Sequence, residues 1–296
     1  MIKYDMSLGV STYRATGPCF RFIQSLPWLT GRKAVFISGP NVNELKFLLE
    51  STEKQDNTDI FFIHTDINHL PFSRALGSLV LLQQGLETEY YISCDDDLEF
   101  IPESGEILSN LREAPPFALC AFNSSHPMHY PEYDYVSGFW KIGIPWIDGN
   151  FIVSKWEDNL KFGFQDSLPE YPLSFYTETE YGWRMKYFTG NDLICNFSEQ
   201  FYLHHFRNSP LQNMIRKDKF SQGVTSGEMF FQRKFGVYGH FNHSTVHKEL
   251  WARILPDLES GNEWKIKRHM MYDGLWNDWK AILNKYEGSF RLVGAK

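Results

Sequence analysis

The first third of the chain alternates short apolar stretches with longer stretches that carry leucine at helical spacing. Aromatic and β-branched residues fill the short stretches, which is typical of strands. Strand–helix alternation predicts an α/β fold with a mostly parallel central sheet and flanking helices on both faces. The expected strands are residues 8–12, 34–37, 60–63 and 90–94, and the expected helices are 20–29, 43–51 and 73–86.

Three consecutive carboxylates, Asp95, Asp96 and Asp97, follow the apolar stretch 90–94. If the strand continues through them, Asp95 and Asp97 point to one face and Asp96 to the other. Neighbouring carboxylates repel unless a hard cation or water surrounds them. Mg²⁺ and Mn²⁺ use few carboxylates and complete their shell with substrate phosphates, and ligands of parallel sheets gather at strand ends. The triplet therefore predicts a metal–diphosphate site, with a solvated acidic turn as the alternative.

Composition and charge indicate what kind of chain this is and which partners it could bind. Aromatic residues make up 17% of the 296 residues, so we expect a sizeable core rather than a disordered chain. Residues 1–205 hold 14 Lys and Arg against 27 Asp and Glu, whereas residues 206–296 hold 15 against 9. The acidic part suits a cation. The basic part suits an anionic acceptor or a solvated surface.

The four cysteines, Cys19, Cys94, Cys120 and Cys195, are far apart in the sequence. They form no C-x-x-C pair, which argues against a zinc site and a disulfide scaffold. No apolar run reaches the length of a membrane span. Reduced thiols and the lack of such a run lead us to expect a cytoplasmic protein without a membrane span.

Several segments, in this order, resemble the family-2-like glycosyltransferases of the GT-A fold. They are residues 10–14, 68–75, 89–97, 148–153 and 177–184, followed by Gly190, His204-His205 and residues 230–236. The segment 89–97 resembles the strand that ends in the D-x-D motif of that family. The resemblance implies a Rossmann-like GT-A domain at residues 1–236, which binds nucleotide sugar and acceptor. We expect residues 237–296, which are rich in tryptophan, to form a helical extension packed on it.

The activity that the resemblance implies is a metal-dependent, inverting glycosyl transfer. A hexosyl or pentosyl group would move from a nucleotide-diphosphate sugar to an acceptor hydroxyl, on a glycan or on a hydroxylated base in modified DNA. DNA is therefore a second candidate partner. The alternatives are a nucleotidyltransferase, which would favour a glycine-rich basic loop that residues 9–13 lack, and a non-catalytic nucleotide- or carbohydrate-binding module.

The expected cofactor is Mn²⁺ or Mg²⁺, bound by Asp97 with help from Asp95. His204 or His205 could add a ligand, because both follow the apolar residues 201–203. Neighbouring residues of a strand point to opposite faces, so at most one of the two histidines reaches the metal. The alternative for either is a hydrogen-bonded structural histidine.

The acceptor hydroxyl needs a base, and Glu178 and Glu180 are the candidates. Thr177 and Glu180 fit a capping box, which would give Glu180 a structural role and leave Glu178 in the first turn. We favour Glu178. In the alternative, both carboxylates only complement the helix dipole.

Two further sets of residues are candidates for substrate contacts. Tyr135, Trp140 and Trp146 could stack on a sugar or serve as packing within an expected long loop at 123–146. Arginines could bind phosphate by charge-assisted hydrogen bonds. The candidate nucleotide-sugar contacts are Thr12, Tyr13, Arg14, Arg74, Asp95, Asp96 and Gly149.

Overall fold

The structure is a computed structural model, and its description covers most of the first two hundred residues. The described residues are 3–12, 16–50, 52, 55–67, 70–122, 133–143, 147, 150–165, 177–196, 203–205, 252–253, 255–262, 284 and 286–296. Only the backbone is described for Thr16, Leu70, Pro71, Tyr133, Thr177, Thr179, Glu180, Leu203, His204 and His205.

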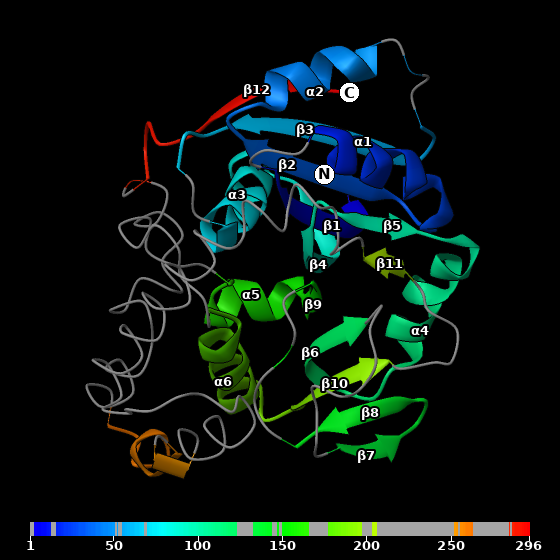
Figure 1. The fold of residues 1–296 in the computed structure, drawn as a ribbon. Coiled ribbons are helices and arrows are strands. Elements are labelled where there is room, and N and C mark those ends of the chain that lie inside the picture. The colour runs from blue at the N-terminus through cyan, green and yellow to red at the C-terminus, as the bar shows by residue number, and fades with distance from the viewer. Residues whose placement is uncertain are drawn as a thin grey trace, which may run out of the picture.

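A twisted sheet runs through the described part of the chain, with strand order β12-β3-β2-β1-β4-β9-β6-β10-β8-β7 (Figure 1). Its strands are β1 (Lys3–Ser11), β2 (Lys33–Gly39), β3 (Thr58–His64), β4 (Glu87–Asp95), β6 (Phe117–Phe122), β7 (Tyr133–Val136), β8 (Phe139–Ile142), β9 (Phe151–Lys155), β10 (Asp192–Asn196) and β12 (Arg291–Ala295). A separate two-stranded sheet pairs β5 (Leu98–Phe100) with β11 (Leu203–His205). The helices are α1 (Thr16–Ser25), α2 (Val42–Glu50), α3 (Leu70–Gln83), α4 (Ile107–Glu113), α5 (Trp156–Phe162) and α6 (Thr177–Thr189), with 3₁₀ turns η1 (Leu26–Trp28) and η2 (Pro102–Glu106).

The sheet is mixed, so the expectation of a mostly parallel sheet is wrong for the molecule as a whole. Strands β3, β2, β1 and β4 are parallel, with the alternating helices predicted from the sequence. Strand β9 is antiparallel to both β4 and β6, and β8, β7 and β12 are antiparallel to their neighbours. Parallel neighbours need a long crossover, which α1, α2 and α3 provide. Ser137 and Gly138, both at positive φ, instead close a tight β7–β8 hairpin within the expected loop.

The two faces of the sheet carry different helices. Leu8, Val10 and Ile92 pack into one cluster with residues of α1, α2 and α4. Tyr91 belongs to a second cluster with residues of α3 and α5. Because side chains alternate along a strand, this pattern directs Asp95, four residues beyond Tyr91, toward α3.

The end of the sequence differs from the expected helical extension. Strand β12 adds to the edge of the sheet by antiparallel pairing with β3 (Figure 1). Residues 237–251 and 263–283 lie outside the described residues, so the helical extension and the 1–236/237–296 division remain predictions. No helix in the described ranges is long and apolar enough to cross a membrane.

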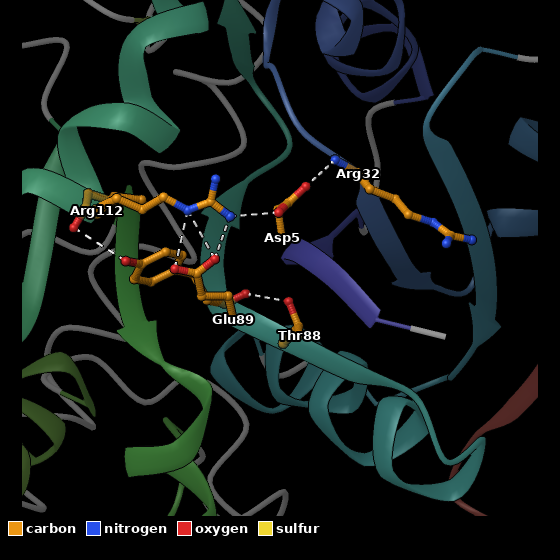
Figure 2. A network of polar contacts seen from close by, with 7 residues as sticks. Asp5, Arg32, Thr88, Glu89 and Arg112 are labelled. Carbon is orange, nitrogen blue, oxygen red and sulfur yellow. Dashed lines mark hydrogen bonds and ion pairs between the residues drawn. The ribbon is translucent and has the colours of Figure 1, made fainter. Parts of the chain in front are cut away.

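A polar network holds the parallel strands at the edge where they begin (Figure 2). The Arg112 side chain donates to Glu89 Oε2 at 2.6 Å and to Asp5 Oδ1 at 2.7 Å, which joins α4 to β4 and β1. The backbone N–H of Arg32 donates to Asp5 Oδ2 at 2.7 Å. These exposed contacts fix the strands at the edge opposite the carboxylate triplet.

Candidate active site

The aspartate triplet forms the turn between β4 and β5. Asp95 is the last residue of β4, and Asp96 and Asp97 make the turn itself. Strand β5, which follows the turn, is anchored in the core, because Phe100 is buried against Phe22 with their ring centroids 5.5 Å apart. Asp97 is 4% exposed, so this is not a freely solvated acidic turn.

Arg74 of α3 is the cation that faces Asp95. The residue is 2% exposed, and its Nη2 donates to Asp95 Oδ1 in an ion pair. Burial lowers the pKa of Arg74, while the charges of Glu178, Asp96 and Asp97 act in the opposite direction. Arg74 therefore lies beneath the carboxylates as their counter-charge rather than on an open surface.

Two glycines allow α3 to come close enough to form this pair. A Cβ at Gly9 would lie 2.1 Å from Tyr91 Oη, and a Cβ at Gly77 would lie 2.5 Å from the same atom. Tyr91 Oη in turn donates to the backbone carbonyl of Arg74 at 2.6 Å. The close approach of helix and sheet sets the position of the guanidinium.

Asp96 contacts the end of β1. Burial is the main reason that the pKa of Asp96 is raised to about 7, and the charge of Asp97 raises it further. A hydrogen bond from the Thr12 hydroxyl and the charge of Arg74 act in the opposite direction and lower this pKa. Thr12 is held by its own N–H, which donates to Ser38 O at 2.8 Å. A Cβ at Gly39 would lie 1.8 Å from Thr12 O, so the end of β2 must be glycine for this contact to form.

Glu178 is the second residue of α6 and is partly exposed. Among the charges that favour the cationic form of Arg74, that of Glu178 has the largest effect, so the two groups are close enough to interact. The side chains of Thr177 and Glu180 are outside the described part, and the capping box remains a prediction.

The histidine pair is brought next to the turn by strand pairing. β11 runs antiparallel to β5, with His205 opposite Leu98 and His204 opposite Glu99. Leu98 directly follows Asp97, so the β11 backbone lies beside the triplet.

Asn150 was not a candidate from the sequence. Its carbonyl accepts a hydrogen bond from Asp95 N at 3.0 Å, and the residue is 7% exposed. Among the described residues its Nδ2 has no hydrogen-bond partner, which is unusual for a buried amide. Its position directly after Gly149 in the sequence was the available signal. Tyr13, Arg14 and Gly149 themselves lie outside the described residues.

The donor chemistry suits a hard divalent cation. Within the described ranges no three His, Cys, Asp or Glu side chains form a metal-binding group. Mg²⁺ commonly takes one or two protein carboxylates and fills its other positions with water and phosphate oxygens, so Asp97 and Asp95 are a sufficient protein contribution. Asp97 is buried and Asp95 and Asp96 are partly exposed, so the turn gathers three carboxylates beside the buried Arg74, and a cation bound there would add to that counter-charge.

The chain is similar to known proteins in its fold rather than in its sequence. No protein family model and no curated protein matches the chain. Among solved structures it is similar to TarS 1–349 from S. aureus, with 10% identity over 94% of this chain and 87% of that one, at a TM-score of 0.46. The complex of TarS with UDP-GlcNAc gives 11% identity and a TM-score of 0.47, with 94% and 87% coverage.

A mannosyltransferase is similar to the same extent. PcManGT from Pyrobaculum calidifontis, in complex with GDP-Man and Mn²⁺, gives 9% identity over 97% of this chain and 89% of that one, at a TM-score of 0.47. The chain thus has nearly full-length structural similarity to proteins that hold nucleotide sugars.

Proposed function

We propose that the chain is a metal-dependent, inverting glycosyltransferase of the GT-A type. The observation that carries this proposal is the gathering of three carboxylates, a buried arginine and Glu178 at the carboxyl ends of β1 and β4. A site for a diphosphate leaving group needs charge balance at one place and a base at another. Both needs have candidates at this edge.

In this proposal Asp97 and Asp95 hold Mn²⁺ or Mg²⁺. The cation, when bound, acts as a Lewis acid and as a template for the diphosphate. Arg74 fixes the Asp95 carboxylate through their ion pair. Asp96 and Thr12 face the nucleotide, and His204 or His205 adds a ligand from β11.

Glu178 serves as the base. The acceptor oxygen attacks the anomeric carbon, the bond from that carbon to the phosphate oxygen breaks, and the hydroxyl proton passes to the Glu178 carboxylate. One displacement inverts the configuration at that carbon. The charge of Arg74 interacts with Glu178 and also with the aspartates that are proposed to hold the metal. We assign the Asn150 amide the role of a donor to a substrate oxygen, because it is buried next to Asp95.

Turnover measurements test these roles. UDP- and GDP-sugars are the first donors to assay with Mn²⁺, because the similar structures hold UDP-GlcNAc and GDP-Man. We expect Glu178→Gln to lose about 10²-fold or more in kcat and to keep donor binding. Glu157→Gln, an exposed carboxylate on α5, is the matched control and should leave both unchanged.

The same assay separates the alternatives. Release of pyrophosphate would indicate a nucleotidyltransferase, and binding without turnover would indicate a non-catalytic module. If the Glu178→Gln enzyme kept its activity, Glu178 would not be the base, and Glu180 would be the next candidate to test. We propose a glycan or modified DNA as the acceptor. We also propose a cytoplasmic location, with which the four free and buried cysteines are compatible because such thiols persist in a reducing compartment.

A further inference from the structure

The β7–β8 hairpin carries an aromatic pair that the transfer site does not use. Tyr135 and Trp140 are directly opposite in the antiparallel register, and so lie on the same face of the hairpin. Their ring centroids are 5.2 Å apart with an interplanar angle of 72°. The Tyr135 residue is 63% exposed, whereas most aromatic residues of the described strands are buried.

Strand β8 holds the Trp140 side of this pair in place. Trp140 packs partly against the cluster that includes Ile142. On the other face of the hairpin, Phe139 is buried against Phe122. Lys141 Nζ binds Asp192 Oδ2 at 2.7 Å, which ties β8 to β10. The exposed Tyr135 ring thus rests against a supported neighbour, which limits the conformational freedom that a covering ligand would remove.

Topology relates this pair to the transfer site. β6 and β10 end at the same edge of the sheet as β4, because both are parallel to each other and β6 is linked to β4 through the antiparallel β9. β8 is antiparallel to β10, so the Ser137–Gly138 turn lies at that edge too. Five strand spacings separate β4 from β7, roughly 24 Å across the sheet. That distance exceeds one sugar ring and suits a chain of several.

We propose that Tyr135, supported by Trp140, is a distal subsite that binds a sugar unit of an extended glycan acceptor. An aromatic ring presents an apolar face to the C–H face of a sugar, and the tyrosine hydroxyl offers a polar edge to its hydroxyls. This inference rests on the proposed glycosyl transfer and assigns its acceptor as an oligosaccharide rather than a single sugar.

Glycan binding without donor tests this subsite. The wild-type chain, in EDTA and without nucleotide, is applied to an array of neutral gluco-, manno- and N-acetylglucosamine saccharides from monosaccharides to hexasaccharides. We expect binding that strengthens with length, a loss of about tenfold for Tyr135→Ala with the longest bound saccharide, and near wild-type binding for Tyr135→Phe. Val136→Ala, on the opposite face of the hairpin, and Phe47→Ala, 72% exposed on α2, are the controls and should match the wild type.

Two results would overturn the inference. One is an array without length-dependent binding by the wild-type chain. The other is equal binding by Tyr135→Ala and the wild type, when both unfold at the same temperature. Failure of the proposed transfer is separate, since it would appear as a lack of donor turnover while length-dependent glycan binding persisted.

Discussion

Arg74 is a buried counter-charge to the carboxylates of the site. Its buried guanidinium pairs with Asp95 and is favoured by three further carboxylates. A buried ion pair contributes modestly as a whole, but removing one partner leaves an uncompensated charge. The position of Arg74 is therefore both a stability feature and a condition for placing Asp95.

Arg74→Met tests this arrangement. We expect the free energy of unfolding to fall by about 3–5 kcal/mol, because the carboxylates lose their buried counter-charge. The double variant Arg74→Met, Asp95→Asn should recover part of that loss, since it removes a charge from each side. Urea denaturation measures both values. Simple addition of the two single effects would show that the residues do not act as a pair.

Lys33 gives a pH dependence with a defined sign. It is 3% exposed at the start of β2, and Nζ donates to Leu29 O at 2.6 Å. Burial lowers its pKa from 10.5 to about 8, against the charge of Asp5. Between pH 8 and 10.5 the unfolded chain keeps the proton that the folded chain has lost, so this residue makes stability rise with pH across that window.

The difference between wild type and Lys33→Met isolates that contribution. We expect the unfolding free energy of the wild type to rise relative to the variant by up to about 3 kcal/mol from pH 8 to pH 10.5. Urea denaturation at a series of pH values gives the difference. Parallel curves for the two proteins would mean that the Lys33 ammonium is not disfavoured in the folded state.

At the scale of elements, glycines set how closely α3 packs on the sheet. A Cβ at Gly77 would lie 2.5 Å from Tyr91 Oη and 2.9 Å from Phe36 Cβ. We expect Gly77→Ala to cost about 1–3 kcal/mol of stability through overpacking and to lower donor affinity by moving Arg74. Gly17→Ala on α1, where an added Cβ meets nothing within 4 Å, is the control and should be neutral or stabilising.

Thermal unfolding and donor binding check this pair of variants. Tyr91→Phe combined with Gly77→Ala should recover part of the stability, because the nearest colliding atom is then absent. A Gly77→Ala protein as stable as the wild type would indicate that α3 can move outward without cost. That result would weaken the link between packing and the placement of Arg74.

The sequence predicted the parallel half of the sheet because strands β1, β2, β3 and β4 are separated by helices of ordinary length. It did not predict the hairpin strands β7 and β8 or the antiparallel direction of β9, because the direction of a short strand depends on tertiary neighbours rather than on its own residues. In the site, Asp95, Asp96 and Asp97 stood out as a local run of charge. The positions of Arg74 and of Asn150 beside Asp95 come from packing between distant segments, which periodicity does not reveal.

At the scale of the whole molecule, the last strand closes one end of the sheet. β12 pairs with β3, and Lys296 Nζ donates to both Thr52 O and Thr52 Oγ1 at 2.7 Å. Lys46 Nζ of α2 donates to Val293 O at 3.2 Å. Removing this strand would expose the backbone groups of β3 as an unpaired edge.

Deletion of residues 291–296 should therefore lower the unfolding temperature by several degrees and increase aggregation on heating. Differential scanning calorimetry with light scattering measures both. Lys296→Met retains the strand and should show a smaller loss. An unchanged unfolding temperature after the deletion would mean that β12 contributes no net stability.

Different groups of polar residues lie at the two ends of the parallel strands. The Asp5–Glu89–Arg112 network joins the strands where they begin, and the carboxylates and Arg74 gather where they end. A cavity of about 600 Å³ lies at the beginning edge as well, lined in part by Leu86, Thr88 and Trp156, and so lies away from the carboxylates. In the proposed function the donor binds at the opposite edge, over the triplet.

Calorimetric titration of nucleoside-diphosphate sugars, with Mn²⁺ and with EDTA, tests that central proposal most directly. We predict a donor among the UDP- and GDP-sugars that binds the wild type only with Mn²⁺, and whose binding is lost in Asp97→Asn but kept in Asp56→Asn, an exposed turn residue. Donor binding of equal strength in EDTA, or undiminished binding by Asp97→Asn, would contradict the account of the aspartate triplet as the metal–diphosphate site.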